Sequence, residues 1–242
     1  MAIDSGKAGE QSLRFISEDA LLVEYGDTLD DSVHQKVRAM DTALRRSRIA
    51  SRIETVPTFR SLLVKFDPFL LTPSTLLALV ESLDASQVEL EPGSWRVPVC
   101  MRGEHAEDLD QVSGLLECTP AELQERILNS TFKLYMYGFA PGFAYLGGLD
   151  PRLAVPRRAT PRKPMPPGSL MIAGGLASLA SVSMPTGWYV IGRTPVHMFS
   201  LQRTQLVPFS VGDTLDFYAV TPGEFARLEA AGERAGMKRG EG

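Results

Sequence analysis

One stretch of this chain, residues 137–169, restricts its own backbone more than any other part of the sequence. Seven of the chain's 17 prolines lie in it, at positions 141, 151, 156, 161, 164, 166 and 167. Each proline removes a backbone donor and restricts the residue before it, so we expect neither a helix nor a central strand here. Large apolar residues, which disordered linkers lack, are interleaved with the prolines: Phe139, Phe143, Tyr145, Leu146, Leu149, Leu153 and Val155. The segment therefore predicts an ordered surface loop.

The same segment is rich in positive charge. Its cations are Arg152, Arg157, Arg158, Arg162 and Lys163. A run of charge is often only a solvated face. Proline next to arginine, as at Pro156-Arg157 and Pro161-Arg162, favours instead a preorganised site for a carboxylate or phosphate. Arg193, which also precedes a turn residue, is a further candidate for this cationic set.

Composition sets limits on the class of protein. The chain has 242 residues, is 44% hydrophobic and 22% charged, and has a net charge of -4. These values predict a globular protein of two domains and argue against a nucleic-acid site spread over a whole face. No apolar run suits a secretory signal or a membrane span, so we expect the cytoplasm and no membrane partner. Cys100 and Cys118 have no metal-ligand spacing, and we expect neither a disulfide nor a metal.

The first half of the chain predicts a mixed α and β domain. After a leader at 1–12, we expect strands at 13–16 and 21–25, an amphipathic helix within 29–49, and two β-rich runs within 53–66. Thr72-Pro73 predicts a helix start, and a short strand is expected near 88–90. Two helices would then cover one face of a mostly antiparallel sheet, in a domain spanning 13–92.

The second half, 93–222, predicts a mainly β domain. Thr119, Pro120 and Glu122 form a capping box that begins a helix. Strands are expected at 95–100, 131–139, 170–173, 188–191, 197–201 and 214–218, and their number favours a closed barrel. The tail at 223–242 is expected to fray.

Other residues also suggest chemistry. Gly168-Ser169 and Gly174-Gly175 bracket a predicted strand and could present backbone donors to an oxyanion, although their spacing favours tight turns at the strand ends. No serine lies in a GxSxG elbow, which argues against a serine triad. His197 is interpreted as structural, and Trp188 as a pocket wall or core residue.

Two stretches, GFAPGFAYLGGLDPRLAVPRRATPRKPMPPGSL and TGWYVIGRTP, resemble the family of allophanate hydrolase subunit 1. This family includes the KipI-type kinase inhibitor, the B subunit of bacterial ATP-dependent 5-oxoprolinase, and subdomains C and D of the carboxyltransferase domain of urea carboxylase. The resemblance extends from about residue 13 to 218. It implies an α+β fold, with a small ferredoxin-like α/β domain followed by a cyclophilin-like β-barrel. It also implies a companion chain similar to allophanate hydrolase subunit 2 or to the C subunit of 5-oxoprolinase.

The residue patterns and the resemblance together give two groups of candidate site residues, while the catalytic residues stay unknown and no metal ligand is expected. The substrate or anion group is Arg157, Arg158, Thr160, Arg162, Gly168, Ser169, Gly174 and Arg193. The pocket or scaffold group is Phe139, Pro141, Phe143, Tyr145 and Trp188.

Two functions of different classes follow from the resemblance. The first is a subunit of an ATP-dependent hydrolase of a small amide or lactam such as 5-oxoproline, with ATP bound by this chain or by its partner. The second is a regulatory protein that inhibits a histidine kinase, which departures from the family pattern at Asn129 and at 176–181 favour. A carboxyltransferase role with biotin would need separate proteins for biotin attachment and ATP use.

Overall fold

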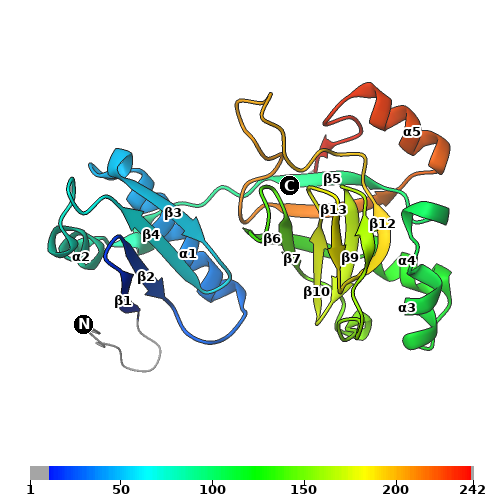
Figure 1. Ribbon diagram of the computed structural model, residues 1–242, viewed down its shortest axis with the longest axis horizontal. Coiled ribbons are helices and arrows are strands. Elements are labelled where there is room, and N and C mark those ends of the chain that lie inside the picture. Colours follow the sequence, from blue (N-terminus) through cyan, green and yellow to red (C-terminus); the bar gives the residue numbers. More distant parts are fainter. Residues whose placement is uncertain (1–10, 241–242) are drawn as a thin grey trace. The chain divides into compact units, whose positions relative to one another are not determined.

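The chain divides into two compact units, the first ending at Glu91 and the second beginning at Pro92. The computed structural model describes residues 11–240 (Figure 1). The expected leader at 1–12 lies mostly outside the described residues. Among the described helices, none is long and apolar enough to cross a membrane.

The first unit is a four-stranded antiparallel sheet with two helices. Its strands run in the order β1 (Ser12–Ser17), β2 (Ala20–Glu24), β4 (Ser61–Phe66) and β3 (Ile53–Pro57). Helices α1 (Asp31–Arg45) and α2 (Pro73–Ser82) share one core with β2 and β4, built from Leu21, Val23, Val37, Met40, Leu44, Leu62, Val64, Leu76 and Val80. One core means that both helices cover the same face of the sheet, as predicted.

Local sequence signals begin both helices. The Asp30 side chain accepts a hydrogen bond from the Val33 N–H at the start of α1. Thr72 does the same for Thr75 at the start of α2, where Pro73 occupies the first turn. Each cap satisfies a donor that the helix itself leaves free.

The expected strand at 88–90 is wrong. A 3-10 turn, η2 (Ala85–Gln87), precedes these residues, which form no strand. The chain turns at η2, which contacts α1, instead of adding a strand to the sheet.

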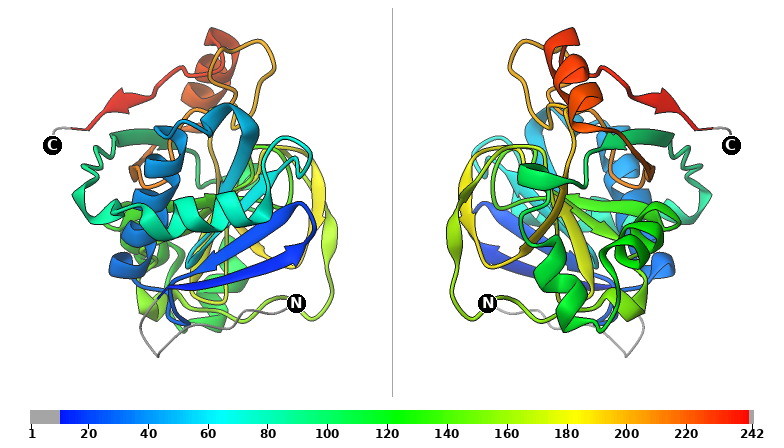
Figure 2. Two further views of the ribbon diagram at one scale, coloured as in Figure 1. Left: turned by 90° about the vertical axis from the view of Figure 1, so that its left-hand side faces the viewer. Right: turned by 90° about the vertical axis from the view of Figure 1, so that its right-hand side faces the viewer.

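The second unit is built on an eight-stranded sheet (Figures 1 and 2). Its order is β12 (Tyr189–Arg193), β9 (Ser169–Ala173), β10 (Leu176–Leu179), β7 (Ala144–Gly147), β6 (Thr131–Tyr137), β13 (Thr214–Ala219), β5 (Ser94–Val99) and β14 (Lys238–Arg239). One large core is shared by the first seven of these strands and by helices α3 (Leu109–Leu115) and α4 (Pro120–Leu128). The predicted capping box of Thr119 and Glu122 is present at α4.

The sheet does not close into the expected barrel. A single antiparallel bridge, Cys100 with Arg193, joins the chain just beyond β5 to β12. Full closure would need the free edge of β5, and β14 occupies part of that edge through Trp95 and Arg96. The mixed α and β class is thus confirmed, whereas the ferredoxin-like and cyclophilin-like assignments stay predictions.

Three further expectations need correction. The proline-rich segment does contain a central strand, β7, because residues 142–150 hold no proline. Residues 197–201 form no strand, since Pro195 ends the pairing of β12. The tail does not fray within the described residues: Thr221 and Glu224 form a second capping box at α5 (Pro222–Ala231), and β14 pairs with β5.

Candidate functional site

Two of the predicted anion-binding arginines are held inside the fold by one carboxylate. Asp108, which is 6% exposed, receives Arg158 Nη1 at 3.1 Å and Arg162 Nη1 at 2.5 Å. Arg162 also pairs with Glu107, and Arg158 donates to the Gln111 amide oxygen at 2.8 Å. This charge-assisted network pairs both guanidinium groups through their Nη atoms without a ligand, while the buried Nε of each has no hydrogen-bond partner among the described residues. The anion-binding role of both arginines stays a prediction, and a ligand would have to compete with Asp108.

Asp108 also ties the network to the sheet. Its N–H donates to the Val190 carbonyl at 2.9 Å, and its Oδ2 accepts the Val190 N–H at 2.7 Å. Sequence reasoning missed this residue, although the acidic segment 104–110 was a signal. The cations of the proline-rich segment need carboxylates as partners, and the acidic segment 104–110 supplies them.

The remaining arginines of the segment differ in whether another residue already pairs with them. Arg152 forms a bidentate pair with Asp150 at the surface. Arg157 is exposed, lies over the Trp188 ring at 5.8 Å, and has no ion pair among the described residues. Thr160 is exposed on the same loop. Arg157 is therefore the arginine of the segment most open to an anion.

The predicted pocket or scaffold residues form a row of ring contacts. Phe139 meets Phe143 at 5.7 Å, Phe143 meets Tyr145 at 5.0 Å, and Tyr145 meets Trp188 at 6.1 Å between ring centroids. Burial raises the pKa of Tyr145, and nearby Arg157 opposes that shift. Phe143 and Trp188 are buried in a cluster that also holds Met165, Met171 and Met184. The row thus packs strand β8 (Arg162–Met165) and β11 (Met184–Thr186) onto the sheet.

The row ends at an exposed, strained residue. Phe139 is 79% exposed and has φ of +68°, a region that L residues rarely adopt. Pro141 beside it is also exposed. Backbone strain of about 1–3 kcal/mol persists only where the surrounding structure enforces it. Such strain often occurs at functional positions, so the turn that carries Phe139 is a candidate contact for a partner.

The two glycine turns do not form one oxyanion site. Gly168 and Gly174 lie at opposite ends of β9, and their N–H groups bond the carbonyls of Ala180 at 2.8 Å and Val155 at 2.7 Å. Ser169 is fully buried and donates to the Pro166 carbonyl. Gly168 has a steric role, because a Cβ there would lie 2.2 Å from the Thr194 carbonyl oxygen.

A small pocket brings Gly168 and Arg193 together. It has a volume of about 150 Å³ and is lined by Pro167, Gly168, Ser181, Arg193, Thr194, Pro195, Val196, His197, Met198, Phe199 and Glu229. Arg193 donates to Glu229 at 2.9 Å and to the Pro167 carbonyl at 3.0 Å, while no described residue accepts from its Nη1. The Ser181 hydroxyl is buried without a partner among the described residues. We call this the Arg193 pocket.

The Arg193 pocket lies beside a perturbed histidine. His105 is buried, and its ring lies 4.2 Å from that of Phe225. Burial, followed by the charge of Arg193, lowers the pKa of His105 below its usual 6.5. His105 is therefore neutral near pH 7. The described residues contain no group of three or more His, Cys, Asp or Glu placed to hold a metal ion.

The chain belongs to the family described as carboxyltransferase domain, subdomain C and D, whose sequence profile matches residues 11–209. That match covers the first unit from residue 11, the second unit as far as residue 209, and the whole proline-rich segment. It confirms the family that the motifs indicated.

Three curated relatives are all B subunits of 5-oxoprolinase. The B subunit from Bacillus subtilis is 29% identical over 223 residues, covering 87% of this chain and 93% of that protein. The B subunit from Haemophilus influenzae is 35% identical over 144 residues, covering 57% of this chain and 68% of that protein. The Escherichia coli O157:H7 protein is 31% identical over 185 residues, or 70% of this chain and 82% of that protein.

Solved structures show the same fold, in two cases within longer chains. A crystal structure of TTHA0988 matches with a TM-score of 0.75 at 23% identity, covering 83% of this chain but only 40% of that one. Kluyveromyces lactis urea carboxylase matches with a TM-score of 0.74 at 15% identity, covering 98% of this chain and 24% of that one. PH0987 from Pyrococcus horikoshii is 28% identical with a TM-score of 0.54, covering 88% of this chain and 99% of that one.

Proposed function

We propose that this chain is a B-type subunit of an ATP-dependent hydrolase of small amides or lactams, with 5-oxoproline as the first substrate to test. The observation that carries the proposal is the alignment with the B subunit of Bacillus subtilis 5-oxoprolinase, which covers 93% of that protein. In TTHA0988 and urea carboxylase this fold accounts for only 40% and 24% of the chain, so in those proteins it is joined to further protein segments. This supports a second protein component for the enzyme proposed here. In our proposal a separate companion subunit supplies that component.

The Arg193 pocket suits the carboxylate of such a substrate. Its volume of about 150 Å³ lies below the roughly 300–1,000 Å³ of sites for drug-sized molecules, so it fits a ligand of few heavy atoms. Arg193 Nη1 offers donors to a carboxylate, and the Ser181 hydroxyl offers a polar contact that the protein leaves unused. The pocket is too small for a nucleotide, and in our proposal ATP binds to the companion subunit.

The chemistry divides between the two subunits accordingly. Opening 5-oxoproline to glutamate consumes one water across the lactam C–N bond, and hydrolysis of ATP to ADP and phosphate consumes another. This chain would hold the substrate by its carboxylate at Arg193, which fixes the position of the lactam bond. Positioning of this kind lowers the barrier without any covalent role for the chain.

The experiment compares two arginines in the reconstituted enzyme. Arg193→Gln in the pocket should raise the KM for 5-oxoproline about tenfold or more, because a charged hydrogen bond to the carboxylate is lost. Arg227→Gln, exposed on α5 outside the pocket, is the matched control and should leave KM within about twofold. Equal effects of the two substitutions, or none, would refute substrate binding at the Arg193 pocket.

A docking role on a histidine kinase is the second candidate, favoured by the exposed, strained Phe139. An aromatic side chain held at a rigid tip is typical of residues that anchor protein partners. Phe139→Ser should then abolish inhibition of the kinase while leaving the chain folded. Recovery of a companion subunit alone from cells, with no kinase, would argue against this role.

A further inference from the structure

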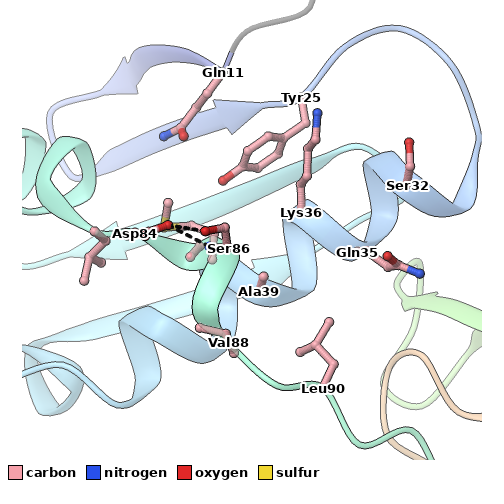
Figure 3. Close-up of a pocket in the computed structure, with 13 residues that line it drawn as sticks. Gln11, Tyr25, Ser32, Gln35, Lys36, Ala39, Asp84, Ser86, Val88 and Leu90 are labelled. Carbon is pink, nitrogen blue, oxygen red and sulfur yellow. Dashed lines mark hydrogen bonds between the residues drawn. The ribbon is translucent and has the colours of Figure 1, made fainter.

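The first unit contains a pocket of about 540 Å³ that the proposed function does not use. Its lining comes from Gln11, from Tyr25 just after β2, from α1 and from the segment around η2, and all of it lies within the first unit. The lining residues are Gln11, Tyr25, Ser32, Gln35, Lys36, Ala39, Met40, Leu83, Asp84, Ala85, Ser86, Val88 and Leu90. Figure 3 shows Tyr25 reaching in from the end of β2, Lys36 from α1, and Asp84 and Ser86 from the start of η2. We call this the Lys36 pocket.

Its floor is apolar and its rim is polar. Ala39 and Met40 are buried, and Leu83, Val88 and Leu90 are half-buried around them. Lys36, Asp84 and Ser86 are exposed at the rim. An apolar cavity with a few convergent polar groups is the usual form of a small-molecule site.

One wall carries an unused hydroxyl. The Tyr25 hydroxyl is shielded from solvent and has no hydrogen-bond partner among the described residues. Burial also raises the pKa of Tyr25, so the group stays a neutral donor. A buried hydroxyl without a partner destabilises the free protein, and a ligand oxygen would remove that cost.

The rim offers one charge of each sign. Within the described residues Lys36 makes no ion pair or hydrogen bond. Asp84 Oδ1 accepts the Ser86 N–H at 3.0 Å and the Ser86 hydroxyl at 2.6 Å, while Oδ2 has no partner there. These contacts hold the Asp84 carboxylate in place and lower its pKa, so it is ionised near neutral pH. A fixed carboxylate and a free ammonium together complement a zwitterion better than a simple anion.

We infer that the Lys36 pocket binds a free α-amino acid with an aliphatic side chain. The ligand carboxylate meets Lys36 and the Tyr25 hydroxyl, its ammonium group meets Asp84, and its side chain covers the floor at Met40 and Val88. The site lies in the first unit, apart from the Arg193 pocket in the second, and the inference does not depend on the proposed reaction. The amino-acid site and the proposed hydrolase function can therefore be refuted independently of each other.

The test is calorimetric titration of the full chain with three matched probes. L-leucine should bind, whereas 4-methylpentanoate, which lacks the ammonium group, and 3-methylbutylamine, which lacks the carboxylate, should each bind at least tenfold more weakly. Equal binding of the three probes would mean that only the apolar floor acts, and would overturn the inference. Absence of heat with L-leucine at millimolar concentrations would overturn it as well.

Variants locate the site and separate binding from folding. Lys36→Gln and Asp84→Asn should each weaken L-leucine about tenfold, and both are exposed substitutions that leave the core intact. Lys65→Gln, on β4 outside the pocket, is the matched control and should bind as the unchanged chain does. Tyr25→Phe should raise the Tm of the free protein while weakening L-leucine, which a purely structural tyrosine would not do. Unchanged affinity in Lys36→Gln and Asp84→Asn would place the ligand elsewhere.

Discussion

At the scale of single residues, the arginines of the proline-rich segment act first on the protein itself. Arg162 has a side chain only 12% exposed, and Asp108 one only 9% exposed. Removing one member of a nearly buried pair leaves the other without a full set of partners. If Arg162 is removed, Arg158 still pairs with Asp108 and offsets part of the loss.

We therefore expect Arg162→Gln to lower the free energy of unfolding by about 2–3 kcal/mol. Chemical denaturation followed by tryptophan fluorescence would measure the change. The neighbouring cation Lys163 is exposed, and Lys163→Gln should change stability by less than about 0.5 kcal/mol. Equal stability of Arg162→Gln and the unchanged chain would contradict an internal role for Arg162.

His105 should make the protein less stable as the pH falls below about 6.5. Its pKa is lowered in the folded protein, so on acidification the unfolded chain takes up the proton first. The contribution of His105 to stability is complete above the unfolded pKa of 6.5 and is lost as pH falls below it. The slope can approach about 1.4 kcal/mol per pH unit for one proton.

The substitution His105→Phe, which keeps a ring against Phe225, should flatten the loss of stability between about pH 6.5 and pH 5. Charges that face His105 and shape its titration are Arg193, Glu104 and Glu229. Denaturation midpoints across pH 5–9 would show curves that run parallel above pH 7 and diverge below it. Parallel curves throughout would show that His105 is protonated equally in both states.

At the scale of elements, the C-terminal tail is part of the second unit. Besides its strand pairing, Lys238 lies 5.5 Å from the Tyr218 ring centre and Arg239 lies 5.2 Å from that of Trp95. A chain ending at Gly236 should lose these contacts and about 1–2 kcal/mol of stability. A chain ending at Gly240 keeps β14 and is the control. Thermal unfolding would compare the Tm values of the two shortened chains. Identical values would mean that β14 does not stabilise the second unit and that the tail is frayed.

Elements set by local sequence could be predicted, and those set by distant partners could not. Thr119, Pro120 and Glu122 define the start of α4 within four consecutive positions. The same signal at Thr221, Pro222 and Glu224 begins α5, so that helix was also within reach. By contrast, β14 exists because β5 has a free edge, and Asp108 meets Arg158 across 50 positions of sequence. Such contacts depend on topology, which spacing alone does not give.

At the scale of the whole molecule, each unit has its own hydrophobic core. Fragments 11–91 and 92–242 should therefore fold separately, each with a cooperative thermal transition. Circular dichroism of the two fragments, beside the full chain, would test this. A fragment without a cooperative transition would show that its core needs the other unit.

The motifs identified the family, whereas the site needed the structure. The proline-rich segment and the stretch TGWYVIGRTP indicated the family because their glycines and prolines restrict the backbone in a particular pattern. The predicted anion group, however, divides into internally paired arginines, an exposed Arg157, and an Arg193 that lies in a separate pocket with Gly168. Charge and spacing do not reveal which cations already have partners.

The central claim, that this chain is a working subunit of an ATP-dependent lactam hydrolase, is tested most directly by an omission assay. Release of glutamate from 5-oxoproline is measured with ATP, the companion subunit and this chain, and then with each of the three left out. The account predicts glutamate release only in the complete mixture, with ADP formed in step with it. Full release without this chain, or none in the complete mixture with 5-oxoproline or related small amides, would contradict it.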